Sequence, residues 1–214
     1  QEEKVLTSNV LTESDTKELP DAIQQHLDST GSHVAFMPNE GPQTDFLAAG
    51  EREVLFGGSA GGGKSYAMLA DPLRFMGHPA FSGLLLRHTT EELRELIFKS
   101  QEMYPKIWPG IKWSERKMQW TAPSGARLWM SYLDREDDVL RYQGLAFSWI
   151  GFDELTQWPT PFPWNYMRSR LRSTATDLPV YMRATTNPGG RGHHWVKKMF
   201  IDPASYGTAF DATD

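Results

Sequence analysis

Short apolar runs alternate with longer amphipathic stretches along most of this chain. The runs at 53–56, 83–88, 147–152 and 179–185 predict buried strands, and the stretches at 64–76, 90–104, 134–142 and 161–173 predict helices. Strands that are apolar at almost every position and alternate with helices indicate a mostly parallel central sheet with helices on both faces. The predicted fold class is therefore α/β.

Two segments add detail to this pattern. Residues 117–121 and 126–133 flank a Pro-Ser-Gly turn, which predicts an antiparallel hairpin added to the sheet. Thr90, which stands before Glu91 and Glu92, is the predicted N-cap of the helix at 90–104.

The beginning of the chain differs from the rest. Residues 1–35 are polar and acidic and predict a partly flexible arm, with a short helix at 20–29. Residues 36–214 then form the predicted compact domain.

Composition excludes several classes of protein. The 214 residues include no cysteine, which rules out disulfides and thiolate metal sites and fits a reducing cytoplasm. No apolar run approaches the roughly 20 residues that a membrane helix needs. The net charge of −5 means that any contact with nucleic acid is local. Most of the 8 tryptophans are expected in the core, and stacking on bases is the lesser alternative.

The strongest motif follows the first predicted strand. Residues 57–65 read GGSAGGGKS, and from Gly58 onward they match the P-loop, or Walker A, pattern. Glycines allow successive backbone N–H groups to face one anion, and the next helix adds the partial positive charge of its N-terminus. Lys64 is expected to reach the β- and γ-phosphates, and the Ser65 hydroxyl to bind Mg²⁺. The predicted ATP-binding loop comprises Gly58, Ser59, Ala60, Gly61, Gly62, Gly63, Lys64 and Ser65.

Two acids end the apolar strand FSWIGF, as in a Walker B motif. Because parallel strands end at one edge of a sheet, Asp153 is expected beside the phosphate loop as a Mg²⁺ ligand. Glu154 is the predicted catalytic residue that activates water. The alternative is that the two acids only cap the next helix. The later strand leads into Thr186 and Asn187, which either sense the γ-phosphate or form a simple Asn-Pro turn.

These elements, in this order, resemble the N-terminal packaging-motor ATPase domain of the large terminase subunit of tailed bacteriophages. The resemblance covers about residues 38–203 and rests on GGSAGGGKS, GLLLRH, RYQG before FSWIGFDEL, RSRLR and ATTNPGG. It implies a P-loop NTPase of the additional-strand catalytic-glutamate class. It also implies Mg²⁺-dependent ATP hydrolysis that drives double-stranded viral DNA into a procapsid, with the portal protein, the small terminase subunit and a homo-oligomeric ring, expected as a pentamer.

The resemblance also implies roles for single residues. Thr186 and Asn187 become the coupling motif, and Gln43 becomes the adenine-reading glutamine, although a lone glutamine is as often a surface residue. Some relatives carry an arginine finger inside the phosphate loop, and this loop has no basic residue before Lys64. Arg141 is the favoured replacement, from this chain or a neighbouring subunit. Arg87 and the arginines of 168–172 are the alternatives.

Further expectations concern the whole protein. Large terminases carry a C-terminal nuclease, which this chain does not include, so no nuclease activity is predicted for it. The resemblance places the protein in the host cytoplasm at the procapsid portal, outside the mature virion. Arg168 and Arg172 are predicted to share a helix face, where they contact DNA phosphates or solvent. The other local basic residues are Arg170, Lys197 and Lys198.

Two other functions remain open from the sequence. One is another ATPase of the additional-strand class, such as a helicase-like nucleic-acid motor, although Leu155 and Thr156 follow the acidic pair where helicases have other residues. The other is an assembly module that binds nucleotide without hydrolysing it. Loss of hydrolysis on changing Glu154, with binding retained, would separate an enzyme from such a module.

Overall fold

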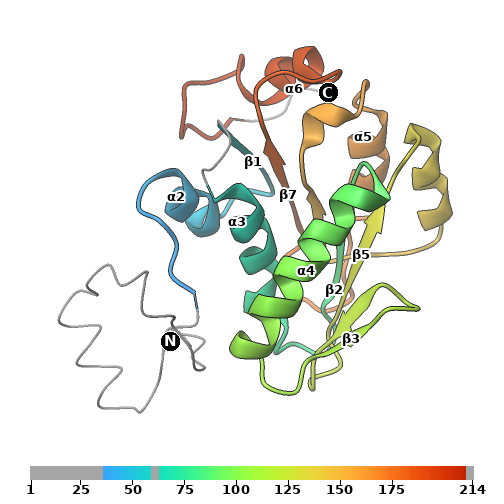
Figure 1. Cartoon of the computed structure of the whole chain (residues 1–214). Coiled ribbons are helices and arrows are strands. Elements are labelled where there is room, and N and C mark those ends of the chain that lie inside the picture. The colour runs from blue at the N-terminus through green and yellow to red at the C-terminus, as the bar shows by residue number, and fades with distance from the viewer. Residues whose placement is uncertain (1–35, 59–62, 211–214) are drawn as a thin grey trace.

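A seven-stranded sheet runs through the centre of the computed structural model, which describes residues 36–58 and 63–210 (Figure 1). The predicted arm and the helix at 20–29 lie outside the described residues, as do Ser59, Ala60, Gly61 and Gly62 of the predicted phosphate loop. The strands in spatial order are β1 (Glu53–Gly57), β7 (Tyr181–Thr186), β6 (Trp149–Phe152), β2 (Ser82–Arg87), β5 (Arg127–Tyr132), β4 (Gln119–Thr121) and β3 (Lys112–Ser114).

The order of the parallel strands confirms the predicted fold class. Strands β1, β7, β6, β2 and β5 pair in parallel, with Gly57 opposite Thr186 and Phe152 opposite Ala184. Strand β7 therefore lies between the strand that precedes the phosphate loop and the strand that precedes the acidic pair. This inserted strand is the defining feature of the additional-strand class.

The antiparallel addition is also confirmed, and it is larger than predicted. Strands β4 and β5 form the expected hairpin, and β3 adds a third antiparallel strand that the sequence did not predict. Strand β5 pairs in parallel with β2 on its other side, so the addition extends the main sheet.

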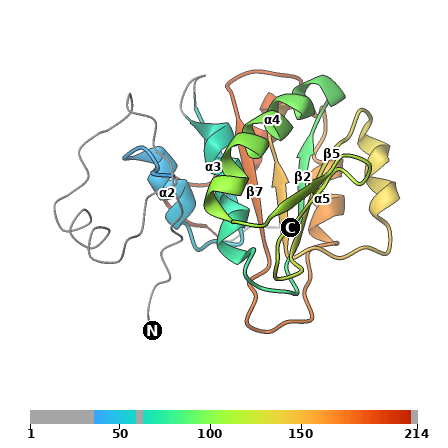
Figure 2. The ribbon, with the colours of Figure 1, turned by 60° about the horizontal axis from the view of Figure 1, so that its bottom comes forward.

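Helices cover both faces of the sheet, as predicted (Figure 2). Helices α2 (Pro42–Ala48), α3 (Lys64–Ala70) and α4 (Thr90–Ile107) lie on one face, and α5 (Phe162–Arg168) and α6 (His193–Phe200) lie on the other. Successive strand residues serve opposite faces, so Leu85 packs in the first core whereas Leu84 and Leu86 pack in the second. The core contains Trp120, Trp149, Trp158 and Trp164, and the other four tryptophans are partly buried and pack against it, which confirms the packing role predicted for most of them.

Three helix boundaries differ from the prediction. The helix at 64–76 changes to a 3₁₀ segment, η1 (Asp71–Phe75), because Pro72 has no N–H to continue the α-helical pattern. The N-cap of α4 is Thr89 rather than Thr90: the Thr89 hydroxyl accepts a hydrogen bond from the Glu92 N–H, and the Glu92 carboxylate accepts one from the Thr89 N–H. The third predicted helix, at 134–142, is another 3₁₀ segment, η2 (Glu136–Tyr142).

Helix α5 ends at Arg168, which is earlier than predicted. The backbone of Arg170 and Arg172 hydrogen-bonds to Phe147 instead of continuing the helix. The prediction that Arg168 and Arg172 share one helix face is therefore wrong. Helix α2 was not predicted, because 30–42 reads as a loop and the helix begins only at Pro42. A short 3₁₀ segment, η3 (Leu155–Gln157), follows the acidic pair.

A buried aspartate joins three elements below the helix that follows the phosphate loop. Asp71 is fully buried, accepts a hydrogen bond from the Trp149 indole N–H at 2.8 Å and pairs with Arg74 at 2.9 Å. Its Oδ2 atom also lies 3.8 Å from Nε of Arg183, which is buried in β7. The Arg183 guanidinium donates further hydrogen bonds to the carbonyls of Glu51 and Ala49. This cluster connects η1 with β6 and β7.

Within residues 36–58 and 63–210, no helix combines the length and the apolarity needed to cross a membrane.

Replacing Asp71 should test this cluster. Asp71→Asn leaves Arg183 buried without a charge partner, so it should lower the free energy of unfolding by about 3–5 kcal/mol, measured by urea denaturation. Lys197→Ala removes an ion pair with Asp202 whose two side chains are about half exposed, and it should cost less than about 1 kcal/mol. Equal effects of the two substitutions would contradict a structural role for the buried cluster.

Candidate functional site

Several of the predicted site residues meet at the carboxyl ends of the parallel strands. Strand β1 ends at Gly57, β7 ends at Thr186, and β6 is followed directly by Asp153 and Glu154. The sheet order places β7 between β1 and β6, so Asp153 is one strand further from the phosphate loop than the sequence suggested. The residues at the end of β7 occupy the intervening position.

The described ends of the phosphate loop have the predicted form. Gly63 precedes α3 in a left-handed conformation, with φ of 69°, and Lys64 begins the helix. The Lys64 side chain is 7% exposed, and its ammonium donates a hydrogen bond to the Gly58 carbonyl at 3.0 Å. Ser65 follows on the first turn of α3 and is partly exposed. Lys64 thus lies across the mouth of the loop, where an anion would meet its charge.

Gln43 contacts the phosphate loop from helix α2. Its side chain is 3% exposed, so it is not the surface residue that a lone glutamine often is. Its amide donates a hydrogen bond to the Gly63 carbonyl at 2.9 Å, and its carbonyl accepts one from the Asn39 N–H at 2.6 Å. A Cβ atom at Gly63 would lie 2.7 Å from the Gln43 amide nitrogen and would displace this side chain, and the left-handed φ of Gly63 also favours glycine.

Asp153 is almost completely buried at the end of β6. The Thr185 hydroxyl donates a hydrogen bond to its Oδ1 atom, and Nη1 of Arg87 lies 3.1 Å from its Oδ2 atom. Burial raises the pKa of Asp153, and the charge of Arg87 and the Thr185 hydroxyl only partly oppose that effect. Among the described residues, no group makes a hydrogen bond of good geometry to Oδ2. This buried oxygen is therefore available to another ligand.

Glu154 has an unusual backbone conformation and two contacts to one residue. Its φ of 60° and ψ of 55° are left-handed, which costs a residue with a Cβ roughly 1–3 kcal/mol. The backbone N–H and the side-chain amide of Asn187 donate hydrogen bonds to its two carboxylate oxygens at 3.1 and 2.6 Å. Burial raises the pKa of Glu154, while the Asn187 N–H and the charges of Arg87 and Lys64 act in the opposite direction. The raised pKa and the fixed position both suit a general base.

Thr185 is a site residue that the sequence prediction did not select. Its fully buried hydroxyl donates to Asp153 and accepts a hydrogen bond from the Glu154 N–H at 3.1 Å, so it connects the two acids. Thr186 points elsewhere and donates to the Thr156 hydroxyl at 2.8 Å. Alternation along the strand would have found Thr185, because adjacent strand residues face opposite sides of the sheet.

The polar groups at this edge fit a magnesium ion that is also held by phosphate. Asp153 offers one buried oxygen that has no hydrogen-bond partner among the described residues, and Ser65 offers a partly exposed hydroxyl. The described part of the chain contains no cluster of three or more His, Cys, Asp or Glu side chains suited to a metal. Mg²⁺ commonly binds in this way, through one or two protein oxygens together with substrate phosphates and water.

Arg141 lies away from this group of residues. It belongs to η2, beside β5, and three strands separate β5 from β1. Its guanidinium donates hydrogen bonds to the carbonyls of Tyr132 and Asp138, at 2.5 and 3.1 Å, and its side chain is 44% exposed. Within the described part of one chain, Arg87 and not Arg141 is the arginine that the structure brings to the acidic pair. A role for Arg141 in a neighbouring subunit stays a prediction.

Several of the other basic residues named from the sequence have partners within the chain. The Arg168 guanidinium is paired with Glu53 and donates a hydrogen bond to it at 2.8 Å. Arg170 lies over the Tyr166 ring, and Lys197 is paired with Asp202. His193 is the first residue of α6.

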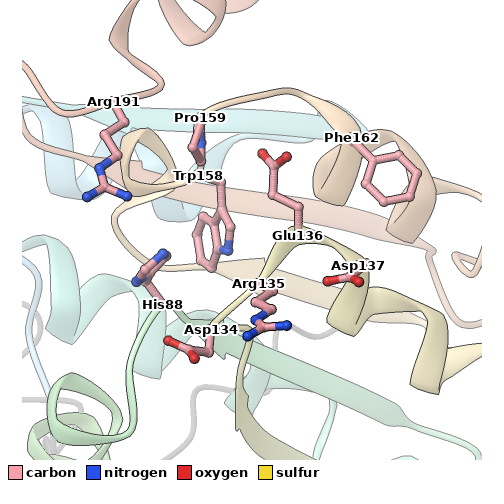
Figure 3. Close-up of a pocket in the computed structure, with 9 residues that line it drawn as sticks. All are labelled: His88, Asp134, Arg135, Glu136, Asp137, Trp158, Pro159, Phe162 and Arg191. Atoms are coloured by element: carbon pink, nitrogen blue, oxygen red, sulfur yellow. The ribbon is translucent and has the colours of Figure 1, made fainter.

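A cleft of about 580 Å³ opens beyond the ends of β2 and β5 (Figure 3). Its lining includes the Trp158 and Phe162 rings, and Glu136 there accepts a hydrogen bond from the Thr160 N–H. None of the described residues of the predicted ATP site lines this cleft. The remaining lining residues are His88, Asp134, Arg135, Asp137, Pro159 and Arg191.

Comparisons with known proteins agree with this geometry. The sequence profile of a family described as the large terminase subunit of the T4-like virus type, N-terminal part, matches residues 55–207. No curated protein matches the chain in sequence.

Solved structures of large terminases share the fold. The HK97 bacteriophage large terminase has a TM-score of 0.56 and 15% identity over 76% of this chain and 36% of its own length. The large terminase of a thermophilic bacteriophage has a TM-score of 0.58 and 20% identity, over 78% of this chain and 43% of its own. The ATPase domain of the Thermus phage P74-26 large terminase has a TM-score of 0.55 and 14% identity, over 82% and 73%. This chain thus spans about a third of the HK97 protein.

The bridge formed by Thr185 can be tested by removing its hydroxyl. Thr185→Val keeps the shape of the side chain but leaves Asp153 and the Glu154 N–H without that partner, so the free energy of unfolding should fall by about 1–3 kcal/mol. The same change should cost less in an Asp153→Asn background, where no buried charge needs the hydroxyl. Urea denaturation of the four proteins gives the coupling, and a coupling of zero would contradict the bridge.

Proposed function

The chain belongs to the family of the N-terminal part of the large terminase subunit of the T4-like virus type, and on that premise we propose that it is a Mg²⁺-dependent ATPase. One observation carries the proposal: Glu154 is held by Asn187 beside Asp153, at the strand edge where Lys64 begins the helix after the glycine-rich loop. A structure that only bound nucleotide would have no need of a carboxylate with a raised pKa there.

Each residue then has a role in hydrolysis. Lys64 and the N–H groups of the loop from Gly58 to Ser65 bind the phosphates, in keeping with the positive end of helix α3. Ser65 and Asp153 would hold the magnesium ion, whose charge would stabilise the negative charge that develops on the phosphate oxygens as ADP leaves. Glu154 accepts a proton from the attacking water, and its raised pKa brings it closer to the pH at which it works.

Gln43 is proposed to read the adenine. Its amide lies against Gly63 at one end of the phosphate loop and can exchange these contacts for a donor–acceptor pair on a base edge. A second crystal form of the thermophilic bacteriophage large terminase, 19% identical over 77% of this chain and with a TM-score of 0.54, contains ADP. That ligand supports a nucleotide in this fold and leaves the role of Gln43 a proposal.

Thr186 and Asn187 are proposed to couple hydrolysis to movement. Asn187 contacts both oxygens of Glu154, and Thr186 contacts Thr156 in the segment after the acidic pair. A change in the charge or position of Glu154 therefore acts directly on the loop that follows β7. This loop leads to α6, which packs on the second face of the sheet.

At the level of the whole subunit, the proposed work is translocation of double-stranded viral DNA into a procapsid. The family supports this role, and the partners would be DNA, the portal protein, the small terminase subunit and further copies of the chain in a ring. The setting would be the host cytoplasm, at the procapsid. A ring also accommodates Arg141, which is partly exposed and distant from its own phosphate loop, as an arginine finger for the neighbouring site.

Glu154→Gln is the central test of the proposed ATPase. The amide keeps the shape of the side chain but cannot accept the proton, so kcat for ATP hydrolysis should fall by about 10²–10⁴-fold. ATP binding, measured by calorimetry, should survive. The matched control is Glu136→Gln, which changes a carboxylate in the neighbouring cleft and should leave kcat unchanged. Full turnover by the Glu154 variant would show that another group activates water.

The pH profile of turnover offers a separate test. Glu154 must be ionised to act as a base, so kcat should fall as the pH drops through its raised pKa, on the alkaline side of the ordinary value of 4.5. Asn187→Leu removes one hydrogen bond to the ionised carboxylate and should move this acidic limb to higher pH. If the limb stays in place while kcat falls, Asn187 acts on something other than the ionisation of Glu154.

A further inference from the structure

Arg87 is the arginine that pairs with the predicted magnesium ligand. It is the last residue of β2, next to the acidic pair that follows β6, and its side chain is 12% exposed. Its Nη1 atom lies 3.1 Å from Oδ2 of Asp153, the oxygen that has no hydrogen-bond partner among the described residues. The guanidinium therefore lies beside the oxygen that is left for the metal.

Charge holds Arg87 in place more than directional bonding does. Its Nε and Nη1 atoms are buried and have no hydrogen-bond acceptor in the part of the chain that the structure describes. By contrast, Arg74 donates hydrogen bonds to Asp71 and to the Leu47 carbonyl, and Arg183 donates to three backbone carbonyls. A guanidinium without such bonds breaks few directional hydrogen bonds when it moves. Arg87 is therefore suited to exchange one carboxylate partner for another.

A second set of carboxylates, Glu92 and Glu95, lies near the start of α4, and the Glu92 carboxylate accepts a hydrogen bond from the N–H of Thr89, which follows Arg87 by two residues. The pKa of Glu92 is lowered even though burial acts to raise it, because a hydrogen bond from Gln157 and the charge of Arg87 favour its ionised form. The pKa of Glu95 is lowered mainly by its hydrogen bond from Lys99, and Arg87 contributes in the same direction. The charge of Arg87 thus acts both on Asp153, 3.1 Å away, and on Glu92 and Glu95, which do not belong to the proposed metal site.

We propose that Arg87 is an exchangeable counter-ion of the metal site: it neutralises Asp153 while no metal is bound, and turns to Glu92 when a divalent cation binds to Asp153. The proposal rests on the proposed ATPase function, which supplies the divalent cation with its nucleotide. A buried carboxylate without any cation would be strongly destabilising, whereas two cations on one carboxylate repel each other. Exchange satisfies both constraints, because Asp153 then has one cation in each state.

The exchange would also connect the metal to the rest of the fold. Glu92 forms the capping box of α4 with Thr89, and it accepts a hydrogen bond from Gln157 in η3, directly after Glu154. When Arg87 turns toward Glu92, its charge therefore moves from the acidic pair to the junction of α4 and η3. Arg87 is a positioning residue in this role, since it acts through Asp153 and Glu92.

Metal affinity gives the decisive test. Arg87→Gln removes the charge but leaves a side chain with amide N–H groups in its place. At alkaline pH and with saturating ADP, the Mn²⁺ concentration for half-saturation, measured from the EPR signal of free Mn²⁺, should fall about tenfold. An unchanged or higher concentration would overturn the proposal, since a purely structural ion pair predicts weaker binding once the site loses its support. Arg74→Gln removes one partner of Asp71, a buried aspartate outside the metal site. It should leave the Mn²⁺ concentration for half-saturation unchanged.

A charge-conserving variant keeps the test independent of folding defects. Arg87→Lys retains the cation, so the Mn²⁺ concentration that half-saturates this variant should stay close to that of the parent chain. If the Lys and Gln variants behave alike, shape and not charge is what matters, and the counter-ion proposal fails. If the parent chain with ADP binds no Mn²⁺ at all, the proposed function fails. If the parent chain binds Mn²⁺ and Arg87→Gln leaves that binding unchanged, only the inference about Arg87 fails.

Stability and the destination of Arg87 give two further readouts. Without metal, Arg87→Gln should lower the melting temperature markedly, and saturating Mn²⁺ with ADP should remove most of that difference. In the parent chain, Glu92→Gln should raise the Mn²⁺ concentration needed for half-saturation. The same substitution should have a smaller effect in the Arg87→Gln background. Equal effects in the two backgrounds would show that Arg87 does not turn to Glu92.

Discussion

The placement of β7 between β1 and β6 is the constraint on which the site depends. Parallel hydrogen bonding sets Gly57 opposite Thr186 and Phe152 opposite Ala184, so the carboxyl ends of the three strands lie at the same edge of the sheet. Thr185, Thr186 and Asn187 therefore come between the phosphate loop and the acidic pair. Glu154 takes its position from this strand, because Asn187 binds its carboxylate and the Thr185 hydroxyl binds its backbone N–H.

The two ends of the sheet treat buried charge in different ways. Near the amino ends of β6 and β7, the Asp71 carboxylate accepts a hydrogen bond from Trp149 and forms ion pairs with Arg74 and Arg183. At the carboxyl ends, Asp153 keeps one oxygen without a hydrogen bond from the described residues, and Glu154 has a strained backbone. Incomplete satisfaction of polar groups costs stability, and proteins retain it where a ligand completes the set.

Placing the acids where water is scarce sets their chemistry. Burial raises the pKa of both Asp153 and Glu154, and nearby cations limit that rise without cancelling it. Arg87, at the end of β2, contributes to this limit for both acids, because its positive charge favours their ionised forms. The same sheet edge thus brings the glycine-rich loop, the two acids, Asn187 and Arg87 together on neighbouring strand ends.

The sequence by itself determined the features that depend on residues close to one another along the chain. The spacing of glycines before Lys64, the apolar run that ends in Asp153 and the alternation of strands with helices are local, and they predicted the loop, the acidic pair and the fold class. The tertiary structure alone decided which distant residues meet. Arg87 reaches Asp153, Thr185 joins the two acids and Gln43 touches Gly63 only because of strand order and packing between segments far apart in the chain. The early end of α5 has the same cause, since residues 170–172 pair with Phe147. Such contacts depend on register across the sheet, and periodicity along one segment carries no information about register.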